Sequence, residues 1–195
     1  MDQASISSGI AMRRRATRTI LAVDDSRTNL GMLSHRLGDL GYLVVLADSG
    51  SQALELVSAR GFDLVLLDQV MPELSGIHVL QEIRGSRDTA DIPVILLTAQ
   101  NDPLGAVDAF AAGADDYLVQ PFEFDVLAAR IARVLARADR IEELKRSNLA
   151  LDARIAARAI ELGEARAELA AAKAESRQLA AANQSLHDEL ARVRS

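Results

Sequence analysis

The chain contains no cysteine and no tryptophan, and aromatic residues make up only 3% of its 195 positions. The absence of cysteine excludes disulfides and thiol chemistry and fits a reducing compartment. So few aromatic side chains provide no platform on which nucleic-acid bases could stack. No apolar run reaches the roughly 20 residues that span a bilayer, and the N-terminal segment lacks the apolar core of a signal peptide. We therefore expect a cytoplasmic protein that contacts neither membranes nor nucleic acids.

Charge is distributed unevenly along the chain, whose formal net charge is −6. Residues 19–124 hold 16 acidic side chains and only five arginines, which argues against nucleic-acid binding by this segment. A basic cluster, Arg13 to Arg15 with Arg18, precedes it. We interpret residues 1–18 as a short, disordered basic tail.

Three short apolar runs are typical of strands that are buried on both faces of a parallel sheet. They cover residues 19–23, 64–67 and 93–97. The intervening segments have helical patterns, and each predicted helix stops before a glycine. These helices cover residues 30–40, 51–60, 76–84 and 104–112. The alternation predicts a doubly wound α/β fold, whose ligands gather at the carboxyl ends of the strands.

Polar residues stand at the carboxyl ends of these runs, namely Asp24 with Asp25, Asp68, and Thr98. The predicted fold brings them together. Three carboxylates about 5 Å apart repel by roughly 3 kcal/mol per pair at an effective dielectric near 20. Either one of them is then protonated or a cation lies among them. Oxygen ligands at a half-open site favour Mg²⁺.

Four motifs, in this order and spacing, resemble the receiver domain of two-component response regulators. They are VDDS at 23–26, LDQVMPELSG at 67–76, LTA at 97–99 and GADDYLVQPF at 113–122. The resemblance covers residues 19–138. It implies a flavodoxin-like domain with five parallel strands in the order 2-1-3-4-5.

The resemblance also assigns roles to individual residues. Asp68 would be the phosphoacceptor, taking a phosphoryl group from a sensor histidine kinase or a phosphotransfer protein. Asp25, Asp68 and the backbone carbonyl of Val70 would bind Mg²⁺ directly, and Asp24 would act through water. Such a domain modifies only itself, so we do not expect an enzyme that acts on a separate substrate.

In the same family, a threonine contacts the phosphoryl group and an aromatic residue then moves, roles that fall here on Thr98 and Tyr117. The motif departs from the family at Gln120, where a lysine is expected. Glutamine offers a neutral donor in place of a full positive charge. Arg27 is either a replacement for that charge or an ordinary solvated residue. Two interpretations follow: a working phosphoacceptor, or a degenerate receiver that serves as a phosphorylation-independent scaffold or docking module.

No proline follows Phe124, and Gly163 is the only later glycine, so the last receiver helix is predicted to continue into residues 139–195. Its receiver part has an apolar face made of Val126, Leu127, Ile131, Val134 and Leu135. Beyond it a heptad repeat fits from Ile141, and 12 of its 16 a and d positions are apolar. The a positions are Ile141, Asn148, Ile155, Leu162, Leu169, Ser176, Asn183 and Leu190, and the d positions are Leu144, Leu151, Arg158, Ala165, Ala172, Leu179, Leu186 and Val193.

This repeat predicts a parallel homodimeric coiled coil. Asn148 and Asn183 at a positions favour two parallel strands. Opposite charges at flanking positions support that orientation, in the pairs Glu161 with Arg166, Glu168 with Lys173 and Glu189 with Arg194. The segment resembles the signalling helices that couple receivers to downstream domains, so an unknown downstream protein or an output domain beyond this sequence is expected. The alternative is an alanine-rich single helix.

Overall fold

The computed structural model describes residues 17–99 and 105–193. They divide between two units, Met1–Asp139 and Arg140–Ser195. Arg13 to Arg15 of the predicted basic tail lie outside the described residues. Among the described residues, no helix is long and apolar enough to cross a membrane.

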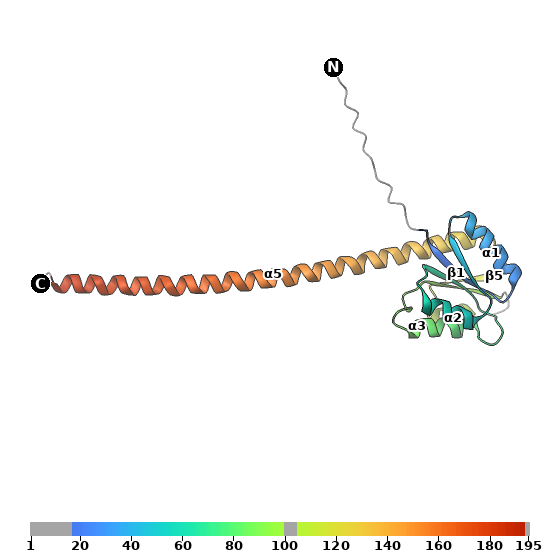
Figure 1. Ribbon diagram of the computed structural model, residues 1–195, viewed down its shortest axis with the longest axis horizontal. Coiled ribbons are helices and arrows are strands. Elements are labelled where there is room, and N and C mark those ends of the chain that lie inside the picture. The colour runs from blue at the N-terminus through green and yellow to red at the C-terminus, as the bar shows by residue number, and fades with distance from the viewer. Residues whose placement is uncertain (1–16, 100–104, 194–195) are drawn as a thin grey trace, which may run out of the picture. The chain divides into compact units, whose positions relative to one another are not determined.

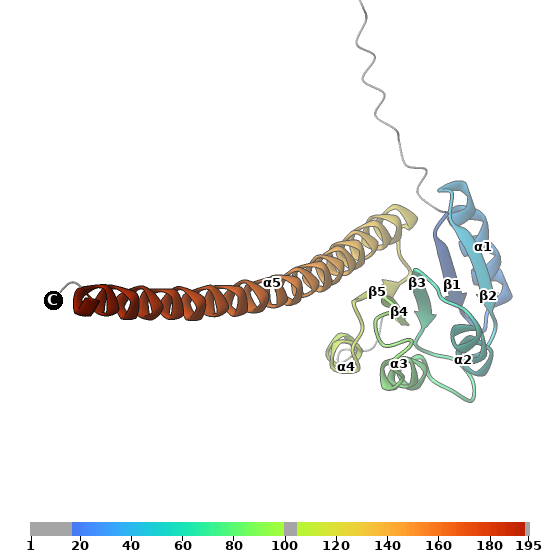
Figure 2. The ribbon, with the colours of Figure 1, turned by 60° about the vertical axis from the view of Figure 1, so that its left-hand side comes forward.

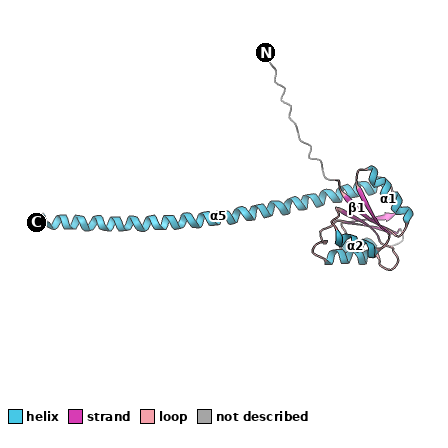
Figure 3. Cartoon of the chain, viewed as in Figure 1, coloured by secondary structure: helices cyan, strands magenta, loops and turns pink. Residues whose placement is uncertain are grey.

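The first unit is built on a single parallel sheet of five strands (Figures 1 and 3). Its strands are β1 (Thr19–Val23), β2 (Leu43–Ala47), β3 (Leu64–Asp68), β4 (Val94–Ala99) and β5 (Asp116–Gln120). They lie in the order β2-β1-β3-β4-β5, and every neighbouring pair is parallel. The predicted doubly wound fold and its strand order are therefore confirmed.

Helices alternate with the strands along the chain. They are α1 (Arg27–Asp39), α2 (Gly50–Ala59), α3 (Gly76–Gly85), α4 (Gly105–Ala111) and α5 (Phe124–Val193). Serine caps fix three of the helix starts, since Ser26, Ser49 and Ser75 each accept a hydrogen bond from a backbone N–H three residues ahead. The prediction that the first helix begins at Leu30 was wrong by three residues, because the cap at Ser26 starts it at Arg27.

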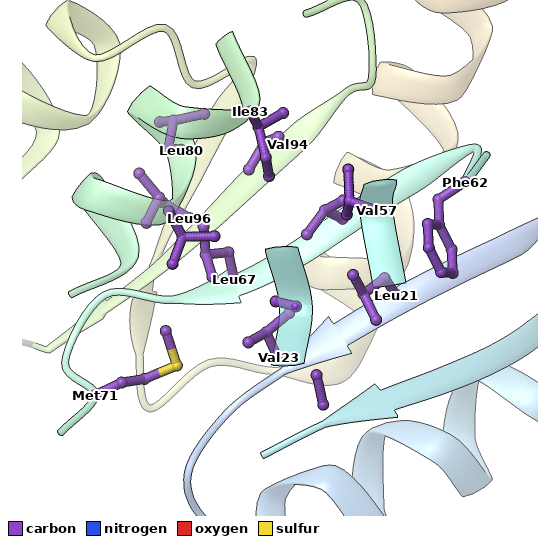
Figure 4. Packing of buried hydrophobic residues seen from close by; sticks show 14 of the residues in the cluster. Leu21, Val23, Val57, Phe62, Leu67, Met71, Leu80, Ile83, Val94 and Leu96 are labelled. Atoms are coloured by element: carbon purple, nitrogen blue, oxygen red, sulfur yellow. The ribbon is translucent and has the colours of Figure 1, made fainter. Parts of the chain in front are cut away.

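Apolar side chains cover both faces of the sheet. On one face, β-strand residues pack with α2 and α3, which lie together in Figure 2. Figure 4 shows this layer at close range, with Leu21 and Leu67 from the strands near Val57 and Leu80 from the helices. On the other face, the strands pack with α1 and with α5 as far as Leu135. Because both faces are covered, only the strand ends are available to ligands.

The receiver part of α5 buries four of the five apolar residues predicted for that face, Leu127, Ile131, Val134 and Leu135. Val126 is the exception, with 44% of its surface exposed. It precedes Leu127 on the helix, and the turn of about 100° between successive residues points it away from the sheet. The predicted apolar face was therefore one residue too wide.

Ion pairs hold the same part of α5 to the sheet. Asp116 on β5 is 3% exposed and binds Arg130 at 2.7 Å and Arg133 at 2.8 Å. At the end of the unit, Arg18 binds both Asp139 of α5 and Asp63 ahead of β3. Arg18 was predicted to belong to a solvated tail, but these two carboxylates hold it against the domain and raise its pKa.

The second unit consists of the remainder of α5. The side chains described from Arg140 to Ser185 are all exposed, including the apolar residues of the heptad repeat. Ion pairs within the helix lie along it, such as Arg146 with Glu142 and Arg158 with Glu161. Arg158 occupies a d position of the heptad repeat. Because Glu161 pairs with it, the charge of Arg158 is compensated within its own helix.

Candidate functional site: an acidic cluster at the carboxyl edge of the sheet

The polar residues predicted to converge do follow neighbouring strands. In the sheet register Val23 lies beside Leu67, and Asp68 lies beside Leu97. The acidic pair after β1, the aspartate that ends β3 and the threonine near the end of β4 therefore share one edge of the sheet. Gln120 ends β5 and lies beside Ala99 at the same edge.

Asp24 is the buried member of the acidic pair, with 1% of its surface exposed. Its Oδ1 accepts the backbone N–H of Ser26 at 2.8 Å, and the side-chain amide of Asn29 donates to both carboxylate oxygens, at 3.2 and 3.0 Å. Asp25, by contrast, is exposed. The two acids thus differ: protein donors fix Asp24, whereas Asp25 is accessible from solvent. Sequence reasoning missed Asn29, whose only signal was its place in the first turn of α1.

Asp68 is half-buried, and its carboxylate accepts hydrogen bonds from the residues around it. Its Oδ2 accepts the backbone N–H of Val70 at 3.2 Å, and its Oδ1 accepts the side-chain amide of Gln120 at 3.3 Å. Burial, then the negative charge of Asp24 and more weakly that of Asp25, raise the pKa of Asp68 to about 6. The charges of Asp24 and Asp25 therefore act on the carboxyl of Asp68.

The loop between β3 and α3 comes very close to the acidic site. The N–H of Gly76 donates to the carbonyl of Gln69 at 3.0 Å. A Cβ atom at Gly76 would lie 2.3 Å from the carbonyl oxygen of Asp68 and 2.9 Å from the Cα atom of Gln69. Only glycine fits there. Val70, the predicted carbonyl ligand, lies in this loop with 66% of its surface exposed.

Thr98 and Tyr117 lie on adjacent strands. Thr98 is 3% exposed, and Tyr117 lies beside Leu96, two residues before Thr98 on β4. Because side chains alternate along a strand, both residues face the same side of the sheet. The ring of Tyr117 meets that of Phe110 on α4 edge to face, with centroids 5.5 Å apart. Sequence reasoning did not identify Phe110 as a neighbour of Tyr117, because their contact depends on how α4 packs.

Arg27 occupies the first position of α1 and is exposed. Among the described residues, no group of three or more histidine, cysteine, aspartate or glutamate side chains stands ready to hold a metal ion. This agrees with the inward orientation of Asp24, whose oxygens already accept hydrogen bonds from Ser26 and Asn29. Direct coordination of a metal ion by Asp25 and Asp68 stays a prediction.

Substituting Asp68 with asparagine is expected to stabilise the domain at neutral pH without divalent cations. The folded state raises the pKa of this carboxyl from 3.8 to about 6, so it holds the proton more tightly than the unfolded chain does. Stability of the native chain should fall as pH rises from about 4 to about 6 and stay lower above that window. Asp68→Asn should lack this fall. Thermal unfolding from pH 4 to 8 in a chelator measures it, and parallel curves for the two proteins would contradict the electrostatic account.

A doubly wound parallel sheet with an acidic cluster at its carboxyl edge, and a threonine and a tyrosine on the next two strands, defines a receiver-type α/β domain. The comparisons are specific. The model of the response regulator receiver domain matches residues 20–132. The chain belongs to this family, whose members are the receivers of two-component systems.

Curated relatives cover the same part of the chain. The probable transcriptional regulator ycf27 of Cyanidium caldarium is 43% identical over 118 residues, which are 60% of this chain and 46% of that protein. The transcriptional regulatory protein ZraR of Escherichia coli K12 is 43% identical over 123 residues, 63% of this chain and 27% of that one. The chain thus spans about half or less of these relatives.

Solved structures also match about the same part of this chain. The chemotaxis protein CheY4 of Vibrio cholerae is 34% identical, covers 61% of this chain and 99% of its own, and has a TM-score of 0.58. NtrX from Brucella abortus is 27% identical with a TM-score of 0.62, over 67% of this chain and 30% of its own. The predicted dimeric coiled coil, the bound Mg²⁺ and the absence of nucleic-acid contact stay predictions.

Proposed function

We propose that this chain accepts a phosphoryl group on Asp68 from a histidine kinase or a phosphotransfer protein. The observation that carries the proposal is the half-buried Asp68 carboxylate at the end of β3, with its pKa raised by burial and by Asp24. A domain with only a structural role has no physical reason to crowd carboxylates, since their repulsion costs stability. In the transfer, an Asp68 oxygen forms a bond to phosphorus while the bond from phosphorus to the donor nitrogen breaks, its electron pair returning to the imidazole.

The oxygen donors of the acidic cluster fit Mg²⁺, which prefers oxygen ligands and retains waters. Asp25, Asp68 and the carbonyl of Val70 would hold the ion, and Asp24 would contact it through water. When bound, the ion supplies positive charge that offsets the carboxylates and the phosphoryl oxygens. The raised pKa of Asp68 supports this assignment, because uncompensated negative charge is what a cation relieves.

The effect of phosphorylation at Asp68 would be transmitted through Thr98 and Tyr117. A bond from Thr98 to the phosphoryl group would bias Tyr117, which contacts Phe110 on α4. Asp116, the residue before Tyr117, is joined to α5 by Arg130 and Arg133. These contacts support a physical route from the phosphoryl site to α5. In this proposal α5 continues as a parallel coiled coil with a second copy, which docks a downstream protein.

The phosphoacceptor is tested by incubating the chain with a small phosphodonor and Mg²⁺ and measuring its intact mass. We expect one added phosphoryl group in the native chain and none in Asp68→Asn. Asp25→Asn serves as the matched control, because it removes a neighbouring carboxylate but keeps the acceptor. Its phosphorylation should be slower and should need more Mg²⁺. Equal incorporation in the native chain and in Asp68→Asn would contradict the proposal.

Gln120 supports a second candidate, a scaffold that signals without phosphorylation. Its amide already contacts Asp68 but carries no charge to stabilise a phosphoryl group. Dimer affinity separates the candidates. A phosphoswitch should show different affinities with and without the phosphodonor, and the difference should vanish in Asp68→Asn. A scaffold should show one affinity throughout.

A further inference from the structure

A second apolar stripe runs along the exposed part of α5, apart from the a and d positions. Between Leu149 and Ala174 it occupies every b and f position of the heptad, with alternate spacings of four and three residues. We call it the b/f stripe. Its members are Leu149, Ala153, Ala156, Ile160, Gly163, Ala167, Ala170 and Ala174. Two of them are large, and Leu149 and Ile160 have 70% and 64% of their surfaces exposed.

A parallel two-stranded coil leaves this stripe uncovered. At about 100° per residue, the middle of the b and f positions lies roughly 150° from the middle of the a and d positions. These positions face water in a two-stranded coil and are ordinarily polar. Exposed aliphatic side chains in a regular row mark an interaction surface. A partner other than the a/d partner is therefore needed to bury Leu149 and Ile160.

We infer that the b/f stripe binds the same stripe of another copy of this chain, in antiparallel orientation. The stripe is self-complementary in that orientation, since its eight positions are symmetric about the midpoint between Ile160 and Gly163. Ile160 of one helix lies opposite Gly163 of the other, and Leu149 lies opposite Ala174. The two remaining layers pair alanine with alanine. Each large side chain thus meets a small one, which lets the helices approach closely.

Charge selects the same orientation. Asp152 and Lys173 flank the stripe on one side. In the antiparallel pair Asp152 of each helix lies opposite Lys173 of the other, so that two opposite-charge contacts form. In a parallel, in-register pair through the same stripe, the flanking partner of Asp152 is Ala157 and that of Lys173 is Gln178. Only the antiparallel pair therefore gains charge complementarity, which fixes orientation more than it adds affinity.

The two surfaces lie on nearly opposite sides of the helix and can act together. The inference rests on the proposed function, because the parallel a/d dimer is the unit that associates through the b/f stripe. Each parallel dimer presents the b/f stripe twice, so association proceeds to a tetramer and then beyond it as concentration rises. Because most contacts in the stripe are between alanines, which bury little apolar surface, each association step is weak. The assembly would therefore depend on the local concentration of the chain.

Sedimentation equilibrium of the full chain tests the inference, with Ile160→Glu and Leu162→Glu as matched variants. The native mass should rise above that of two chains with concentration. Ile160→Glu changes an f position and should give a constant two-chain mass, whereas Leu162→Glu changes an a position and should dissociate the parallel dimer. A native chain that stays at the two-chain mass overturns the inference but leaves the proposed dimer standing. Persistence of larger species in Ile160→Glu also overturns it.

Disulfide trapping tests the orientation, because the chain has no cysteine of its own. Ala153→Cys and Ala170→Cys lie opposite each other in the antiparallel pair. A mixture of the two variants should cross-link on oxidation, and neither variant should cross-link alone. Cross-linking of Ala153→Cys with itself, or none in the mixture, overturns the antiparallel arrangement.

Discussion

Gln120→Lys is expected to raise the rate or the extent of phosphorylation at Asp68 by roughly 10- to 100-fold. The amide of Gln120 already lies 3.3 Å from Oδ1 of Asp68, so the end of β5 reaches the acceptor. A lysine there replaces a neutral donor with a charged one, and such a hydrogen bond is worth about 1.5 to 3 kcal/mol. The measurement is the time course of phosphoryl incorporation from a small donor, followed by intact mass.

The control for this substitution is Gln120→Met, which keeps the length of the side chain and removes its donor. The expected order of rates is lysine, then glutamine, then methionine. The lysine should also lower the pKa of Asp68, because a positive charge near a carboxylate favours its ionised form. If lysine and glutamine support the same rate and the same structural response, then the charge at this position is not what limits the native site.

Gly76→Ala is expected to destabilise the receiver by about 2 to 3 kcal/mol. The new Cβ atom would lie 2.3 Å from the carbonyl oxygen of Asp68, and the nearest atoms are backbone, which cannot swing aside as a long side chain would. To relieve this steric clash, the loop between β3 and α3 must move. That loop carries Val70, whose N–H donates a hydrogen bond to Asp68. Phosphorylation should therefore fall together with stability. Chemical unfolding measures the first effect and intact mass the second.

Gly31→Ala is the matched control for that substitution. Gly31 lies within α1, and nothing is within 4 Å of the Cβ atom that alanine would add. Alanine in a helix interior is more favourable than glycine by about 1 kcal/mol, so this variant should be slightly more stable than the native chain. Equal destabilisation by both substitutions would show that the close contact at Gly76 is not what makes it necessary.

The sequence predicted the sheet and its acidic edge because both depend on strong local patterns. Apolar runs such as 64–67 require burial on both faces, and the aspartates that follow them have only one edge to occupy. The departure at Gln120 was also visible in sequence, and the structure adds that its amide reaches Asp68. The strand order and the lysine expected at position 120 came from the resemblance to receiver domains, because local patterns identified only three of the five strands.

Other features depend on contacts between distant segments, which no local pattern encodes. Arg18 looked like part of a basic tail because its neighbours are arginines, yet its partners Asp63 and Asp139 are 45 and 121 residues away. The contact between Phe110 and Tyr117 depends on the packing of α4. Position 76 requires glycine because the backbone of Asp68 lies against it, a contact that only the folded structure shows.

The most direct test of the account is to locate the modification. The native chain, treated with a phosphodonor and Mg²⁺, should carry one phosphoryl group as an acyl phosphate, which hydroxylamine removes and borohydride reduces. Peptide mass spectrometry after reduction should then place the change at Asp68 alone. A label on another residue, or a chain that stays unmodified at saturating donor even as Gln120→Lys, would contradict the claim that Asp68 is a phosphoacceptor.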